Sequence, residues 1–292
     1  MLNNLNILVL GGDRRYLEVI KKLAKSNANV HLAGFDKQQF TDQNVYNNVL
    51  EELDYSNIHA ILLPVSGTSQ TGKVLTQYSD RSITLTQELI DKTPKNCIIY
   101  TGITNPYLDD IVKGRTLIPI FSRDDIAIRN SIPTAEAALQ LAIQHTDITI
   151  HRSNVCVLGF GRVGITVARL FANVGATVTV AVRKSADIAR IYEMGLQPIP
   201  FQNINEVAPK IDVFLNTVPQ MVIDSDLMDK MNHDALIIDL ASDPGGTDFK
   251  AAEKHGIKAL LALGLPGKTA PKSAGNIIAE TLLPLLVEKH MS

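Results

Sequence analysis

The chain has 292 residues, of which 45% are hydrophobic and 20% are charged, and its formal net charge is -2. This balance is typical of globular proteins and excludes a disordered or fibrous chain, and the length suits two domains. The small net charge argues against a nucleic-acid-binding protein, because binding a phosphate backbone requires concentrated positive charge.

The beginning of the chain and its two cysteines indicate a cytoplasmic protein. We find neither a basic leader followed by an apolar run nor an apolar stretch long enough to cross a bilayer, so we expect no signal peptide and no membrane association. Cys97 and Cys156 lie in apolar runs, which predicts buried thiols in a reducing compartment. No Cys/His spacing resembles a metal site, so no metal is expected.

The first half of the chain contains short apolar runs at residues 7–10, 30–33, 60–63 and 97–100. Each run is followed by a polar or glycine-containing loop, which is typical of strands in a parallel sheet covered on both faces. We therefore expect an α/β protein with two doubly wound parallel-sheet domains, of which the C-terminal one is a Rossmann domain.

A change of pattern after residue 121 predicts a helix that joins the two domains. Ser131 is a suitable N-cap, and Pro133 then falls in the first turn, where its missing N–H costs nothing. The expected domains are residues 1–132, a flavodoxin-like domain that binds the substrate, and residues 133–273, a Rossmann domain that binds NADP. By analogy with two-domain dehydrogenases, a last helix within residues 274–292 is expected to pack back on the first domain.

A glycine motif opens the second domain directly after an apolar run at residues 154–158. In this context the first glycine permits a tight turn, the second lets a pyrophosphate approach the backbone, and the third allows close packing of helix on strand. The motif therefore predicts a dinucleotide site, with a ligand-free glycine turn as the alternative. The expected contacts are Gly159, Gly161, Arg162, Val163 and Gly164.

The residues after the second strand expected in this domain, at 177–182, favour NADP over NAD. NAD-binding domains usually place an acidic residue there to bind the ribose 2′-hydroxyl, but this chain has Arg183, Lys184 and Ser185. Arg183 can bind a 2′-phosphate, with assistance from its two neighbours. The alternatives are NAD as cofactor and a solvated basic loop without a ligand.

Further strands are expected at residues 212–215, 236–240 and 258–262. The loops that follow the first two of them lie at the sheet edge where the nicotinamide half of a cofactor is bound. Ordinary turn chemistry is the alternative for both of them. The expected contacts are Thr217, Val218, Pro219, Leu240 and Ala241.

A dense group of polar residues between 123 and 134 suggests a site for a small dianionic substrate held between the domains. Asp125 is a candidate acid or base if it is partly buried, and His145 is a second candidate, although a histidine at a helix end is usually a partner of the helix dipole. An exposed loop with salt bridges is the alternative. The candidate substrate-binding residues are Arg14, Ser66, Arg123, Asn130, Ser131 and Thr134.

Runs at residues 123–136, 142–147, 239–249 and 264–271, together with the opening Leu10-Gly-Gly-Asp-Arg-Arg15, resemble the family of dipicolinate synthase A subunits from spore-forming bacteria. The resemblance covers nearly the whole chain. It implies an oxidoreductase that acts with a flavoprotein-like partner, the dipicolinate synthase B subunit, in the mother cell of the sporulating bacterium, as part of an oligomer.

The resemblance also implies that the substrate is a small dicarboxylate, which agrees with the polar residues between 123 and 134. This is dihydrodipicolinate, or 4-hydroxy-tetrahydrodipicolinate with loss of water, and the product is dipicolinate, which accumulates with calcium in the spore core. Two alternatives stay open. One is a dehydrogenase for another small hydroxy or ring acid, and the other is an NADP-binding subunit whose partner carries out the chemistry.

Overall fold

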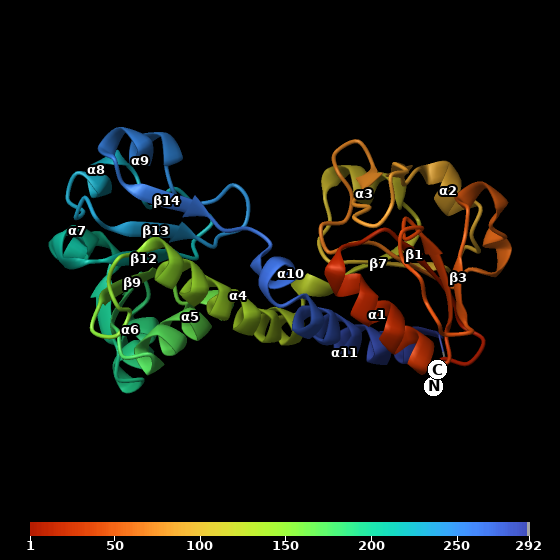
Figure 1. Cartoon of the computed structure of the whole chain (residues 1–292), viewed down its shortest axis with the longest axis horizontal. Helices are drawn as coiled ribbons and strands as arrows, with labels where there is room; N and C mark the ends of the chain where they lie inside the picture. Colours follow the sequence, from red (N-terminus) through yellow and green to blue (C-terminus); the bar gives the residue numbers. More distant parts are fainter. Residues whose placement is uncertain (291–292) are drawn as a thin grey trace. The chain divides into compact units, whose positions relative to one another are not determined.

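The computed structural model describes residues 1–290, and the chain divides into two compact units (Figure 1). Unit 1 comprises Met1–Arg129 and the C-terminal segment that starts at Ala270, and unit 2 comprises Asn130–Thr269. Residues 291 and 292, which the sequence places in the last helix, lie outside the described residues. Within residues 1–290, no helix is long and apolar enough to span a membrane.

Unit 1 is built on a sheet of six parallel strands in the order β3-β2-β1-β4-β7-β8. The four strands expected from the apolar runs are confirmed, whereas β3 and β8 were missed because their side chains are largely exposed or half-buried. A short antiparallel pair lies outside the sheet. The strands are β1 (Asn6–Leu10), β2 (Asn29–Ala33), β3 (Val45–Asn47), β4 (Ala60–Leu62), β5 (Lys73–Val74), β6 (Ile83–Thr84), β7 (Ile98–Thr101) and β8 (Thr116–Pro119).

This strand order corrects the expectation of a flavodoxin-like unit. With β3 on the outer edge of β2, the order is that of a Rossmann sheet, whereas a flavodoxin-like sheet places its third strand on the other side of the first. The physical reason is that β3 carries little apolar pattern. It consists of only Val45–Asn47, so the sequence alone did not reveal a strand there.

Helices cover both faces of the unit 1 sheet. Along β1, Ile7 and Val9 point into the core formed with α1 and α11, while Leu8 and Leu10 point into the core on the other face. Helices α1 and α11 lie side by side, as Figure 1 shows. The helices are α1 (Arg14–Lys25), α2 (Gln87–Asp91), α3 (Pro106–Ile111) and α11 (Pro271–His290), with 3-10 turns at Leu50–Glu52, Tyr55–Asn57 and Ile120–Ser122.

Unit 2 repeats the same topology, with six parallel strands in the order β11-β10-β9-β12-β13-β14. Five of the strands were expected. The edge strand β11 was missed because it contains Pro198 and Pro200, which argue against a strand except at a sheet edge. The strands are β9 (Asn154–Leu158), β10 (Thr177–Val182), β11 (Gln197–Pro200), β12 (Val213–Asn216), β13 (Leu236–Asp239) and β14 (Lys258–Leu261).

Successive side chains along the unit 2 strands also point to alternate faces of the sheet. Val155 and Val157 of β9 belong to one core, and Cys156 and Leu158 belong to the other. Both cysteines of the chain are buried free thiols, as expected. The helices are α4 (Asp124–His145), of which residues 124–129 belong to unit 1, α5 (Arg162–Asn173), α6 (Ser185–Glu193), α7 (Ile204–Val207), α8 (Ser225–Met228), α9 (Phe249–His255) and α10 (Leu265–Thr269), with 3-10 turns at Phe201–Asn203 and Ala208–Lys210.

The expected helix start at Ser131 and Pro133 is wrong, because α4 already begins at Asp124 and Pro133 lies inside it. A proline in a helix interior costs about 3 kcal/mol, since it removes one backbone hydrogen bond and crowds the preceding turn. Ala135, Ala138 and Ala142 of the same helix are buried in the unit 2 core. This packing compensates for the proline, an effect that local sequence signals do not reveal.

Candidate functional site

The glycine motif of unit 2 forms a tight turn between β9 and α5. Gly159 has φ of +93°, and its amide donates to the Ala181 carbonyl at 3.1 Å. A Cβ on Gly164 would collide with the Gly159 carbonyl oxygen, so the third glycine allows the close approach of helix and strand. Both positions therefore require glycine for reasons of backbone geometry.

The N-terminus of α5 is open. Gly161 is the N-cap residue and provides no side-chain cap for the first turn, and a Cβ placed on it would meet no described atom within 4 Å. The first turn of a helix presents backbone N–H groups and the positive end of the dipole, which together attract a phosphate. A dinucleotide's diphosphate therefore fits this turn, and Arg162 and Val163 begin the helix beside it.

A cavity of about 170 Å³ lies next to the turn, at the carboxyl end of β10. The Arg183 guanidinium stands over the Phe201 ring with its carbon 5.2 Å from the ring centroid, and Arg183 Nη1 donates to Gln220 Oε1 at 3.4 Å. A cation over an aromatic ring is attracted by the ring quadrupole, so Phe201 helps to hold Arg183 in place. Asp187, in the first turn of α6, also lines the cavity.

Lys184 and Ser185 follow Arg183 at the start of α6, and both are exposed. Lys184 is the N-cap residue of this helix, without a side-chain cap hydrogen bond to any described residue. The expected group of three polar residues therefore lies together at the carboxyl end of β10. Phe201, Gln220 and Asp187 were not expected. Phe201 and Gln220 come from distant segments that no sequence pattern placed beside Arg183.

The predicted loop after β12 packs against the glycine turn. The Thr217 hydroxyl donates to the Leu158 carbonyl at 2.8 Å, and a Cβ on Gly159 would lie 2.7 Å from that hydroxyl oxygen. Val218 also lines the cavity that contains Arg183, whereas Pro219 is exposed at the end of the loop. This loop is therefore placed to contact whatever the glycine turn binds.

A buried pair of polar residues connects this loop to the one after β13. Asn216 Nδ2 donates to Asp239 Oδ1 at 3.0 Å, and the amides of Ala241 and Gly246 donate to the two carboxylate oxygens of Asp239 at 3.0 and 2.9 Å. Both side chains are fully buried. Leu240 and Ala241, the other expected contacts, thus belong to a loop that Asp239 holds rigid.

Most of the candidate side chains on α4 already form hydrogen bonds with other residues of the protein. Ser131 is buried and shares a 2.6 Å hydrogen bond with Thr166, and the Thr134 hydroxyl donates to the Asn130 carbonyl at 2.9 Å. The Asn130 Oδ1 atom is buried without a hydrogen-bond partner among the described residues. Asn130 therefore keeps an acceptor available, whereas the two hydroxyls are already in use.

Asp125 lacks the burial on which an acid–base role depends. Its side chain is 53% exposed and forms a 2.9 Å ion pair with Arg123. The hydrogen bond from Arg123 is the main cause that lowers the pKa of Asp125 below its ordinary value. At neutral pH it is therefore an exposed, paired carboxylate, as in the salt-bridged alternative considered above.

His145 lies at the wrong edge of the unit 2 sheet for a role at the cofactor turn. It ends α4 and lines a cavity of about 490 Å³ together with Asp212, Ala235 and Lys258, which stand at the amino ends of three strands. The glycine turn follows the carboxyl end of β9, and strands of four or five residues separate the two edges by about 13–16 Å. The geometry thus does not support catalysis by His145.

Two other candidates in unit 1, Arg14 and Ser66, lie at the carboxyl edge of its sheet. Arg14 is exposed at the start of α1, and Ser66 is exposed in the loop after β4. The neighbouring Arg15 is buried and donates to Asp13, with Nη2 2.6 Å from Oδ2. Of these two adjacent arginines, only Arg14 is therefore placed to reach a dissolved ligand.

Comparisons with known proteins agree with this division of the chain. The family model for the N-terminal domain of the dipicolinate synthase A subunit matches residues 6–121, and "D-isomer specific 2-hydroxyacid dehydrogenase, NAD binding domain" matches residues 128–244. The curated A subunit of dipicolinate synthase from Bacillus subtilis (strain 168) is 49% identical over 99% of this chain and 98% of its own length.

Two crystal structures are also similar. The dipicolinate synthase A subunit from Bacillus halodurans aligns with a TM-score of 0.96 at 49% identity, over 98% of this chain and 99% of that one. The corresponding protein from Bacillus subtilis aligns with a TM-score of 0.94 at 49% identity, over 100% of this chain and 98% of that one. The matched NAD binding family makes unit 2 a nicotinamide dinucleotide-binding domain with an oxidoreductase-type fold.

Proposed function

Since the chain belongs to the family of dipicolinate synthase A subunits, we propose that it oxidises dihydrodipicolinate, or 4-hydroxy-tetrahydrodipicolinate with loss of water, to dipicolinate. The oxidation removes a hydride and a proton from the ring, which becomes aromatic. Oxidised NADP, when bound, accepts the hydride. Aromatisation supplies driving force, so the protein mainly has to bind and orient the two molecules.

The observation that carries this proposal is the open N-terminus of α5 beside a fixed arginine. Gly161 leaves room for a diphosphate at the start of a helix. Arg183 lies over Phe201 at the position where such domains recognise the 2′ group of the adenosine ribose. A guanidinium there attracts a 2′-phosphate, so the geometry favours NADP over NAD. The loop that Asp239 holds rigid provides a wall for the nicotinamide half.

For the substrate, we propose that Arg14 binds one of the two carboxylates. It is an exposed cation at a sheet edge where ligands of α/β domains bind. Ser66 is a hydrogen-bond donor at the same edge and would help Arg14 to orient the ring. A partner of the B-subunit type would act with this chain, in an oligomer in the mother-cell cytoplasm.

Reconstitution tests the proposal. The purified chain, alone and with the B subunit, is supplied with the cyclic substrate and NADP, and dipicolinate is followed by its ultraviolet absorbance while NADPH is followed separately. We expect dipicolinate and NADPH to form in equal amounts. Dipicolinate formed only with both chains would indicate a shared reaction. Tight NADPH binding without any turnover in either mixture would contradict the dehydrogenase role and favour a non-catalytic protein.

A further inference from the structure

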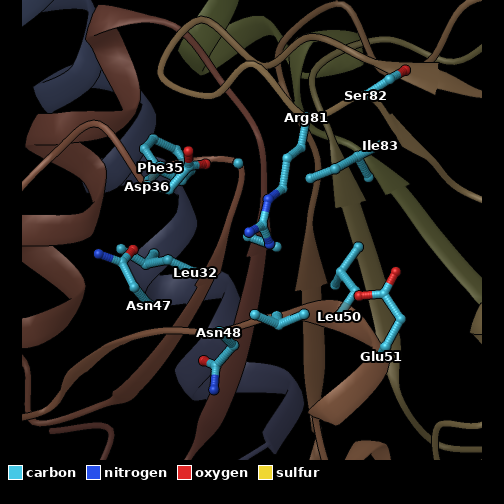
Figure 2. A pocket seen from close by; sticks show the side chains of 13 residues that line it. Leu32, Phe35, Asp36, Asn47, Asn48, Leu50, Glu51, Arg81, Ser82 and Ile83 are labelled. Atoms are coloured by element: carbon cyan, nitrogen blue, oxygen red, sulfur yellow. The ribbon is translucent and has the colours of Figure 1, made fainter.

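Unit 1 contains a cavity of about 210 Å³ that the proposed oxidation does not use. It opens after the carboxyl ends of β2 and β3, and the segment around Arg81 closes its other side. Figure 2 shows Arg81 reaching between Phe35 and Asp36 on one side and Leu50 and Glu51 on the other. The cavity thus has one cationic, two acidic and several apolar side chains.

The position of this cavity within its sheet matches that of the Arg183 cavity in unit 2. Both sheets have the same strand order, and the cavities lie beyond the carboxyl ends of β2 and β3 in unit 1 and of β10 and β11 in unit 2. In a Rossmann sheet this place receives the adenosine end of a dinucleotide. Asp36 lies three residues beyond the end of β2, in the loop that carries the ribose-binding acidic residue of such domains.

The remaining walls suit a flat ring. Leu32, Leu50 and Ile83 line the cavity with apolar side chains, and Asn47 adds an amide. The charge of the Arg81 guanidinium acts on the Asp36 carboxylate, but no hydrogen bond and no ion pair within 4 Å joins this guanidinium to any residue from 1 to 290. Its planar face can therefore stack on a ligand. A guanidinium stacks well on a heteroaromatic ring, and an asparagine can bind the polar edge of such a ring.

A phosphate, in contrast, has no place beside this cavity. The Gly12 amide donates to the Leu75 carbonyl at 2.7 Å, and a Cβ on Gly11 would collide with the same oxygen. The first turn of α1 is capped by the Asp13 carboxylate, which accepts from the Arg15 amide at 3.0 Å. Backbone groups that would bind a diphosphate are thus engaged or beside a negative charge.

We propose that this cavity is a second, non-catalytic site that binds a nucleoside, with the ribose diol on Asp36 and the base stacked on Arg81. Phosphates contribute nothing to binding there. The proposal is independent of the reaction assigned to unit 2. Adenosine fits this cavity because its ribose diol can bind Asp36 while its purine stacks on Arg81.

Calorimetric titration with adenosine tests the proposal. We expect saturable binding that Asp36→Asn weakens about tenfold and Arg81→Ala about fivefold, because a hydrogen bond to a charged group and a stacked cation contribute energies of that size. Both side chains are exposed, so neither change should unfold the protein. Asp110→Asn, an exposed carboxylate on α3 outside the cavity, is the matched control and should bind like the wild type.

Two ligand variants sharpen the test. 2′-Deoxyadenosine should bind about tenfold more weakly than adenosine to the wild type, with no further loss in Asp36→Asn, because both changes remove the same contact. Adenosine monophosphate should bind no more tightly than adenosine. Absence of adenosine binding, or binding that survives both Asp36→Asn and Arg81→Ala, would overturn the proposal, and the latter result would assign the adenosine to the Arg183 cavity instead.

Discussion

The sheets of the two units have the same strand order, but the helix after the first strand begins with a side-chain cap in unit 1 and without one in unit 2. In both, a glycine-containing turn leads from the first strand to a helix, in strand orders β3-β2-β1-β4-β7-β8 and β11-β10-β9-β12-β13-β14. In unit 2 the N-cap residue is Gly161, without a cap side chain. In unit 1 it is Asp13, which caps the helix and pairs with Arg15.

This difference shows that the topology alone does not make a diphosphate site. The same parallel sheet presents a helix start in each unit, but only one start has backbone N–H groups and space that an anion can use. In unit 1 a carboxylate already occupies the favourable end of the dipole, and the Leu75 carbonyl accepts the Gly12 amide. Binding is therefore decided by a few residues at the turn.

The largest effect on cofactor affinity is expected when the N-cap glycine of α5 in unit 2 is replaced by aspartate, the N-cap residue of α1 in unit 1. Gly161→Asp should raise the Kd for NADPH at least a hundredfold, or about 2.7 kcal/mol, because the carboxylate would occupy and repel the diphosphate position. The protein should stay folded, since a Cβ there meets no described atom within 4 Å and aspartate is a good N-cap. Fluorescence titration measures the Kd.

Gly161→Ala is the control for that change, because it adds a Cβ without a charge and should change the Kd less than about fivefold. If both variants lost affinity equally, crowding rather than charge would explain the difference between the two units.

Arg183→Ala should weaken NADPH about thirtyfold and NADH less than threefold, because only NADPH carries the 2′-phosphate that the guanidinium would bind. Parallel titrations with the two reduced cofactors measure the ratio. Arg190→Ala, a change on the exposed face of α6 outside the cavity, should leave both affinities unchanged. Equal losses for both cofactors would contradict the 2′-phosphate contact.

In unit 1, Asp13→Ala should reduce the free energy of unfolding by about 1.5 kcal/mol, because it removes the helix cap and leaves the buried Arg15 without its carboxylate. Urea unfolding measures this change. NADPH affinity should not change, which would confirm that the capped helix start takes no part in cofactor binding. Asp110→Ala, which removes an exposed ion pair, should have almost no effect on stability.

Phe201→Leu should have the smallest effect, about a threefold loss of NADPH affinity, because leucine keeps the apolar contact but not the ring beneath Arg183. NADH affinity serves as the internal control and should stay constant. A loss shared by both cofactors would show that Phe201 supports the base rather than the arginine.

Much of the fold could be predicted because buried parallel strands are short apolar runs followed by turn residues. The strand at Thr177–Val182 was expected with these bounds. The failures are equally specific. Val45–Asn47 and the proline-containing Gln197–Pro200 are edge strands with little apolar pattern, and α4 continues through Pro133 because its alanines are buried in a core.

The glycine turn and the basic residues after β10 could be predicted from local patterns, because local backbone geometry and the choice of charge at one position carry that information. The groups that surround them could not be predicted in this way. Phe201 and Gln220 reach Arg183 from distant segments, Asp239 ties two loops together, and the Leu75 carbonyl accepts the Gly12 amide. Such contacts depend on how the chain folds back on itself, which no local pattern of residues records.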